Sequence, residues 1–374
     1  MHSSKRGTFL SDYIKLVSEA IDADHQGNHD IVRFGPEQLT ARDLPRQNVR
    51  MQQNGQNIEV DSGLLTVHRA LQLVQNCLPQ LEWVYAKMGD AESRRTLVEV
   101  TAFRALGHRK IKLSVNNPQH DENLKIAEKL VCSDEVLDVG WHGLKLERMN
   151  LSPIGFPIEL FWSPYGTVID FIEQQYACRS ENGDISCEAG DYVIDGGACW
   201  GDTALYFAAL AGNEGKVFSF EFLPENIAVF QKNLSLNPDL SKNIHHLPNA
   251  LWSKSGETLS FASNGPGTRL AAPAGQTECR VKTMHIDGLV GSGMARKIDF
   301  IKMDIEGAEL QALKGAEKTI KKFKPKLAIT IYHDFKDFWT IPQYIDSLGL
   351  GYQFEMRHFT IHSEETLIFA KTPL

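Results

Sequence analysis

The sequence is organised around residues 192–203, which read YVIDGGACWGDT. A short apolar run ends at Asp195, a glycine-rich turn follows, and from Ala204 the residues favour helix, without glycine or proline until Gly212. This pattern predicts a strand, a tight loop and a helix. Such a loop presents unpaired backbone N–H groups at a helix N-terminus, and its glycines let a ligand approach the main chain. We therefore expect a nucleotide-like ligand here.

Strands and helices continue to alternate towards the end of the chain. Strands are expected at residues 192–195, 216–221, 245–251, 299–304, 326–332, 352–356 and 366–370, with helices near 202–211, 226–237, 309–323 and 341–348. Five strands separated by helices predict a doubly wound parallel sheet. The last two strands leave no room for a helix, so they are expected to form an antiparallel hairpin. The predicted fold class is α/β, with a mostly parallel, seven-stranded, Rossmann-like sheet.

The first 150 residues have a different character. Residues 1–60 are mainly polar, and part of this stretch is expected to be disordered. Apolar residues at helical spacing predict helices within 64–88, 90–107 and 123–131. We therefore divide the chain into a mainly helical region, 1–150, of unknown role and a sheet-containing domain, 151–374.

Charge and composition exclude several classes of protein. The net charge of −8 argues against a general binder of nucleic acid or anionic membranes. No run of eighteen apolar residues and no signal-like N-terminus is present, so we expect a cytoplasmic protein without an integral membrane segment. The six cysteines form no C-x-x-C pair, and no histidines or carboxylates have the spacing of metal ligands, so no metal is expected. The sequence does not decide whether the chain forms a homo-oligomer.

Polar residues stand where the predicted strands end. In an open α/β sheet, ligands bind at the carboxyl ends of the strands. The residues at or near those ends are Asp195, Glu221, Asn249, Asp304 and His333. Burial alone would not place so many polar residues at these strand ends, so we take the strand ends as the candidate site.

The loop itself discriminates between ligands. A dinucleotide site favours G-x-G-x-x-G, but here the middle glycine is replaced by Ala198 in one frame and by Cys199 in the other. The pattern present is D-x-G-x-x-x-G, formed by Asp195, Gly197 and Gly201. An acid at the mouth of the loop would repel phosphate and suit a cationic ligand that carries an amino group. S-adenosylmethionine has both of these features and no phosphate.

Glu221 lies 20 residues after Gly201, and its carboxylate can accept hydrogen bonds from both hydroxyls of a ribose. Folds that bind NAD place an acid at the same point, so Glu221 predicts a ribose without choosing the cofactor. An NAD(P)-dependent oxidoreductase is therefore the competing enzyme class. A module that binds cofactor or glycan without turnover is the non-enzymatic alternative.

Three segments together resemble the FkbM family of class I, S-adenosylmethionine-dependent methyltransferases. They are DGGACWG at 195–201, FEFLPEN at 220–226, and DFIKMDIEGAE at 299–309 followed by LKGA at 313–316. The similarity covers about residues 160–374, and the first 150 residues carry no motif that we can use. Gly196 and Cys199-Trp200 differ from the commoner V-G-A-N-x-G loop, which affects ligand packing more than ligand class.

The resemblance implies methyl transfer to an oxygen, with hydroxyls of glycans, glycolipids or secondary metabolites as acceptors. The residues expected to bind S-adenosylmethionine are Asp195, Gly196, Gly197, Gly201, Glu221, Asn249 and Asp304. Catalytic roles are predicted for Asp304, which could bind the acceptor or take its proton, and for His333, whose neutral imidazole suits a general base near pH 7. A structural role for His333 remains open.

Glu306, Arg269 and His358 are the residues expected to contact the acceptor. Each has a simpler alternative. Glu306 can cap the following helix, Arg269 can be solvated in a flexible loop, and His358 can be structural.

Overall fold

The computed structural model describes residues 7–31, 35–37, 47–53, 56–270 and 279–373. Part of the polar stretch for which disorder was expected, residues 1–6, 32–34, 38–46 and 54–55, lies outside this description. The chain forms two compact units, Met1–Pro118 with Glu355–Thr366, and Gln119–Phe354 with Leu367–Leu374.

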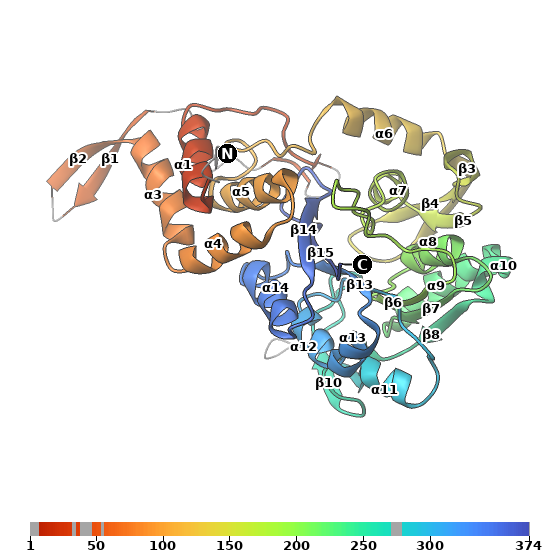
Figure 1. Ribbon diagram of the computed structural model, residues 1–374. Coiled ribbons are helices and arrows are strands. Elements are labelled where there is room, and N and C mark those ends of the chain that lie inside the picture. The colour runs from red at the N-terminus through yellow and green to blue at the C-terminus, as the bar shows by residue number, and fades with distance from the viewer. Residues whose placement is uncertain (1–6, 32–34, 38–46, 54–55, 271–278, 374) are drawn as a thin grey trace. The chain divides into compact units, whose positions relative to one another are not determined.

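The first unit contains most of the predicted N-terminal helices (Figure 1). Its elements are α1 (Phe9–Ala20), β1 (Asn48–Gln53), β2 (Gln56–Asp61), α3 (Ser62–Val74), α4 (Leu78–Lys87) and α5 (Ala91–Leu106). The helical pattern of 64–88 is interrupted before Pro79, which occupies the first turn of α4. Helix α5 begins after Asp90, whose side chain accepts a hydrogen bond from the Ser93 N–H, and ends at Gly107 with φ +83°. A helix interior would reject both proline and a left-handed residue.

The seven-stranded sheet that was predicted lies mainly in the second unit, and part of one strand, residues 355–358, belongs to the first unit. Its strands are β6 (Tyr192–Gly196), β7 (Lys216–Phe220), β8 (Ile244–Leu247), β12 (Phe300–Met303), β13 (Lys326–Thr330), β14 (Gln353–His358) and β15 (Thr366–Lys371). Their spatial order is β14-β15-β13-β12-β6-β7-β8. The strands from β13 to β8 are parallel, and β15 pairs antiparallel with β13. The doubly wound, mostly parallel fold is confirmed.

Helices connect these strands (Figure 1). They are α8 (Asp202–Ala211), α9 (Pro224–Leu236), α10 (Pro238–Ser241), α11 (Ile286–Gly291), α12 (Glu309–Lys314), α13 (Glu317–Phe323) and α14 (Asp337–Ser347). Val193, Ile194, Phe218, Phe300 and Ile301 are fully buried. Consecutive strand residues point to opposite faces, so both faces of the sheet are covered, as expected of a parallel sheet.

Two smaller sheets differ from the predictions. The first joins β3 (Val131–Asp138), β4 (Lys145–Asn150) and β5 (Glu159–Trp162). In the chain this sheet follows α6 (Pro118–Glu128) and precedes the short helices α7 (Pro164–Thr167) and η2 (Val168–Ile172), while η1 (Ser152–Ile154) lies between β4 and β5. Since β4 pairs with both β3 and β5, the compact units divide at Pro118, whereas the sequence predicted a boundary at residue 150.

The second small sheet contains β9 (Ala250–Leu251), β10 (Thr258–Phe261) and β11 (Cys279–Met284), in the order β10-β11-β9. The single strand predicted at 245–251 is therefore wrong. It divides after Leu247, where β8 ends, and β9 continues in a different sheet. Pro248 has no N–H with which to continue the ladder, which explains the break.

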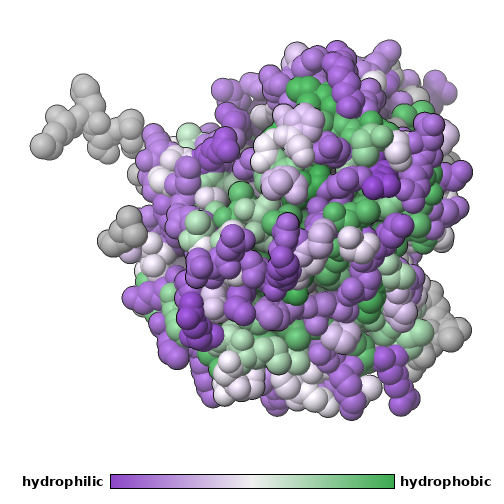
Figure 2. Space-filling view, turned by 90° about the vertical axis from the view of Figure 1, so that its right-hand side faces the viewer, coloured by the Kyte–Doolittle hydropathy of each residue, from purple (hydrophilic) through white to green (hydrophobic). Residues whose placement is uncertain are grey.

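No helix among the described residues is long and apolar enough to cross a bilayer. The face of the molecule in Figure 2 is mainly hydrophilic, with apolar residues in small groups between the polar ones.

Candidate functional site

The loop after β6 passes very close to the end of β12. Gly197 has φ +78°, and a Cβ at this position would lie 1.9 Å from the backbone oxygen of Asp304. Gly201, with φ +88°, precedes α8, and its Cβ would lie 3.0 Å from the ring of Phe230. Both positions require glycine, for its left-handed backbone and for the space. The glycines thus fix the loop against β12 as well as exposing its main chain.

A buried ion pair supports this loop from below. The Lys302 ammonium lies 3.1 Å from Asp195 Oδ1 and donates hydrogen bonds to the backbone oxygens of Gly196, at 3.0 Å, and Gly197, at 2.7 Å. Thr203 and Ser219 also donate to the Asp195 carboxylate, at 2.9 and 3.0 Å. Burial alone lowers the pKa of Lys302, but the neighbouring carboxylates, Asp195 foremost, have the larger effect. The pKa is therefore raised and the ammonium stays charged.

The expectation that Asp195 stands at the mouth of the loop is therefore wrong. Its side chain is completely buried, its partners are protein groups, and it is absent from the walls of the cavity described below. The residue alternation of β6 turns the carboxylate into the core, where it supports the loop and does not reach a ligand.

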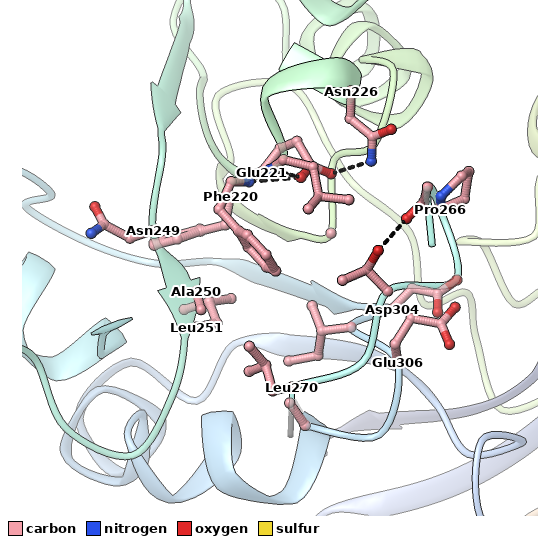
Figure 3. A pocket seen from close by; sticks show the side chains of 17 residues that line it. Phe220, Glu221, Asn226, Asn249, Ala250, Leu251, Pro266, Leu270, Asp304 and Glu306 are labelled. Carbon is pink, nitrogen blue, oxygen red and sulfur yellow. Dashed lines mark hydrogen bonds between the residues drawn. The ribbon is translucent and has the colours of Figure 1, made fainter. Parts of the chain in front are cut away.

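A cavity of about 490 Å³, including its open mouth, lies at the carboxyl ends of β6, β7 and β12 (Figure 3). Its walls are formed by Gly197, Phe220, Glu221, Phe222, Leu223, Asn226, Asn249, Ala250, Leu251, Gly265, Pro266, Thr268, Leu270, Asp304, Ile305, Glu306 and Ala308. Most of these side chains are apolar, and a few carboxylates and amides stand among them. This lining, mostly apolar with a few polar groups among it, is typical of small-molecule sites.

Glu221 forms one wall of the cavity and is held in place by α9. Its Oε1 accepts the N–H groups of Phe222, at 2.7 Å, and Leu223, at 2.8 Å, while Oε2 accepts the Asn226 amide at 3.2 Å (Figure 3). Burial raises the pKa of Glu221, and these hydrogen bonds oppose the shift. Asn226 in turn accepts the Trp200 indole N–H at 3.1 Å. The carboxylate is fixed, and its second oxygen keeps acceptor capacity for a ligand.

Asn249 lines the cavity, but its side chain points away from Glu221 and Asp304 (Figure 3). Its amide donates to the backbone oxygen of Lys282 at 3.2 Å. Because Asn249 lies between β8 and β9, it belongs to a turn and not to a strand end. The cavity therefore brings together Gly197, Glu221, Asn249 and Asp304 of the predicted cofactor residues, whereas Asp195, Gly196 and Gly201 lie outside its walls.

Three acids surround His333 beside the cavity. The ring Nδ1 lies 3.1 Å from Glu309 Oε1, and Nε2 lies 3.4 Å from Asp304 Oδ1 and 3.5 Å from Glu306 Oε1. Burial alone lowers the pKa of His333, but these carboxylates overcome that effect and raise it well above the usual value. The carboxylates therefore favour the protonated form of the imidazole. The argument that a neutral His333 acts as general base does not fit these surroundings.

Asp304 has the opposite electrostatic situation. It lines the cavity, and burial raises the pKa of its carboxyl, although the His333 and Lys302 cations oppose this shift. A carboxylate with a raised pKa is a better proton acceptor than an ordinary one. Of the two predicted catalytic residues, Asp304 is the one that lines the cavity, and its catalytic role stays a prediction.

Glu306 and Arg269 meet at the rim of the cavity. Glu306 lines it in a left-handed backbone conformation with φ +57°. Arg269 Nε lies 3.6 Å from Glu306 Oε2, and the guanidinium donates to the His333 backbone oxygen at 3.3 Å. Four neighbours of Arg269, namely Gly265, Pro266, Thr268 and Leu270, also form part of the wall.

Comparison with known proteins relates part of the chain to a family. Residues 187–357 match the family described as the methyltransferase FkbM domain. This segment is similar to an FkbM methyltransferase domain. Methyltransferase sdnD from Sordaria araneosa is 28% identical over an alignment of 160 residues, which covers 34% of this chain and 61% of that protein. The structure of methyltransferase FkbM from Methylobacillus flagellatus KT aligns with a TM-score of 0.50 at 21% identity, over 80% of this chain and 60% of that one. This chain thus spans about three-fifths of the length of each relative.

His358 follows the segment that matches the FkbM domain and does not line its cavity. It lies in the first unit, where its Nδ1 is 2.8 Å from the Thr366 hydroxyl. Burial lowers the pKa of His358 to about 4, and the Arg104 cation adds to the shift. His358 therefore lies away from the walls of this cavity, and its contact with the acceptor stays a prediction.

Sequence reasoning missed two buried residues of the segment that matches the FkbM domain. Lys302 was treated as part of an apolar strand, and Glu309 only as the start of a helix, yet their side chains are 1% exposed. The signal for Lys302 was available, because a lysine between Ile301 and Met303 in a strand buried on both faces requires a buried partner. Glu309 gave no comparable signal, since acids are common in the first turn of a helix.

Proposed function

We propose that this chain is an S-adenosylmethionine-dependent methyltransferase that methylates a hydroxyl oxygen of a saccharide, glycolipid or glycosylated metabolite. The observation that carries the proposal is the match to the FkbM domain, in a segment whose cavity has the rigid Glu221 carboxylate on one wall and Asp304 on another. The choice of oxygen and of a sugar acceptor rests on resemblance to the family, and the experiments below test it.

The residues of the cavity suit the cofactor. Glu221 Oε2 accepts a hydrogen bond from the Asn226 amide, and the carboxylate has further acceptor capacity for a ribose hydroxyl. Apolar walls at Leu223, Leu251 and Leu270 suit a flat adenine ring. Gly197 lets the amino-acid end of the cofactor approach the main chain.

Methyl transfer requires alignment and loss of one proton. S-adenosylmethionine supplies a methyl group that is already activated by the adjacent sulfonium. The chain has to hold the acceptor oxygen in line with that methyl group and remove the hydroxyl proton. We assign the proton to Asp304, because its carboxylate lines the cavity and has a raised pKa.

Isothermal titration with S-adenosylmethionine, S-adenosylhomocysteine and NADH tests the cofactor. We expect both adenosyl compounds to bind with a stoichiometry of one and NADH not to bind. Binding of NADH alone would replace the proposal with an oxidoreductase.

The acceptor is tested by incubating the protein with labelled S-adenosylmethionine and a panel of sugars, glycolipids and glycosylated metabolites. Mass spectrometry of a product should locate the new methyl group on oxygen. Methylation at nitrogen or carbon would contradict O-methylation, and binding without any turnover would favour the non-enzymatic alternative.

A further inference from the structure

Asp304, Glu309 and His333 converge beside the cavity, although they come from three separate segments. Asp304 follows β12, Glu309 opens α12, and His333 follows β13. Each offers one ligand atom, and these atoms all lie within 4.8 Å of one another. No spacing in the sequence shows such a set, because the parallel pairing of β12 and β13 brings it together.

Three polar atoms of this cluster are buried without a hydrogen-bond partner among the described residues. The side chains of Glu309 and His333 are 1% and 2% exposed. Among the described residues, Glu309 Oε2 and both ring nitrogens of His333 have no partner with hydrogen-bond geometry. The contacts of His333 with the acids are close, at 3.1–3.5 Å, but are not aligned hydrogen bonds. Buried polar atoms without partners are costly, which points to a group that binds among them.

The backbone holds the cluster in a fixed arrangement. Glu309 Oε1 accepts the Ile305 N–H at 2.9 Å and lies 3.3 Å from the Thr330 hydroxyl. These bonds direct the carboxylate towards the ends of β12 and β13, where Asp304 and His333 lie. Preorganised ligands on strand ends are what a selective ion site requires.

We propose that Asp304, Glu309 and His333 bind a divalent cation. Two carboxylates and one imidazole form a mixed oxygen and nitrogen set, which suits Mn²⁺ among the common divalent ions. A dication would displace the proton from the His333 ring, take its place in offsetting the negative charge of the carboxylates, and occupy the atoms that lack partners. Since Asp304 also lines the cavity, the ion would lie within reach of an acceptor oxygen, a consequence that rests on the proposed function.

The test is direct binding of Mn²⁺ to the full chain after treatment with a chelator. Electron paramagnetic resonance of free Mn²⁺ should show one saturable site, with Mg²⁺ and Zn²⁺ added as competitors. We expect Glu309→Gln and His333→Asn each to weaken the affinity at least tenfold. Glu317→Gln is the matched control, because Glu317 is exposed on α13 and pairs with Lys321, and it should leave the affinity unchanged.

The change in melting temperature on adding Mn²⁺ is a second measurement, which is still informative if a variant folds poorly. Mn²⁺ should raise the melting temperature of the wild type and of Glu317→Gln, with a smaller rise for Glu309→Gln and His333→Asn. Absence of a saturable site, or equal affinity in all four proteins, would overturn the proposal. Titration with S-adenosylhomocysteine is run on the same samples. Cofactor binding without Mn²⁺ binding rejects only the cation site, and the reverse rejects only the proposed function.

Discussion

His333 and His358 are both buried, yet their surroundings move their pKa values in opposite directions. Three carboxylates beside His333 raise its pKa, whereas burial near the Arg104 cation lowers that of His358 to about 4. Both rings lose solvation, so the difference comes from the charges around them. The comparison shows that carboxylates gather at the strand ends of the second unit and favour the charged form of His333. The surroundings of His358 favour its neutral form.

The two units also differ in which parts of the chain their buried ion pairs stabilise. In the second unit, Lys302 joins Asp195 to the backbone of the cavity loop. In the first unit, the Arg357 guanidinium lies 2.6 Å from Asp90 Oδ2 and donates to the Ser93 hydroxyl at 2.9 Å, which ties the segment 355–366 to helix α5. One pair supports the ligand loop, and the other supports packing.

The largest effect is expected when the cation of the Lys302–Asp195 pair is removed. Lys302→Met leaves Asp195 charged and buried without its cation, so we expect a loss of about 3–5 kcal/mol in the free energy of unfolding. Binding of S-adenosylhomocysteine should fall with it, since the loop loses its anchor. Urea unfolding and calorimetry measure the two effects.

Arg357→Met is the matched change in the first unit. It should cost a similar free energy, about 3–5 kcal/mol, while affinity for S-adenosylhomocysteine stays unchanged. If both variants kept or both lost cofactor affinity, the distinction between the two pairs would disappear.

The histidines should give opposite dependences of stability on pH. The folded pKa of His358, about 4, is below the usual 6.5, so its neutral form favours folding. Its contribution is present above pH 6.5 and is lost as the pH falls towards 4, by about 3 kcal/mol in total. For His333 the folded pKa is raised, so its stabilisation is present below pH 6.5 and is lost as the pH rises through that raised value.

Unfolding of the chelator-treated wild type, His333→Asn and His358→Asn between pH 4 and pH 9 measures this difference. NMR titration of the two imidazoles gives the pKa values independently. Shifts in the same direction for both rings would refute the electrostatic account.

A smaller effect is expected at Glu221. Glu221→Ala removes charged hydrogen bonds to ribose, worth about 1.5–3 kcal/mol, so the affinity for S-adenosylhomocysteine should fall about 10- to 150-fold. Glu225→Ala, in the first turn of α9 and outside the walls of the cavity, is the control and should bind normally. Equal affinity in wild type and Glu221→Ala would remove Glu221 from the cofactor site.

The smallest effect is expected at the rim. The Arg269 side chain is 57% exposed and lies 3.6 Å from Glu306, so Arg269→Gln should change the free energy of unfolding by less than about 1 kcal/mol. Cofactor affinity should not change. A raised KM for the acceptor with an unchanged kcat would identify Arg269 as a binding residue, and unchanged kinetics would leave it as a solvated side chain.

Most of the fold and part of the site were predictable from the sequence. Apolar runs separated by helical patterns gave the seven strands, and the glycines at 197 and 201 gave the loop, because these signals are local. The turn at Pro248 was missed, although proline marks it, and the strand pairing of residues 131–150 was missed because partners distant in sequence decide it.

By itself, the sequence determined the order of the elements, the glycine loop and the acid that follows β7, since each depends on neighbouring residues. Only the tertiary structure decided what the charged side chains meet. It pairs the buried Asp195 with Lys302 and places His358 in the first unit. It also brings Asp304, Glu309 and His333 together near the ends of two adjacent strands. Charge and pKa depend on distances across the fold, and the pairing of strands far apart in the chain sets those distances.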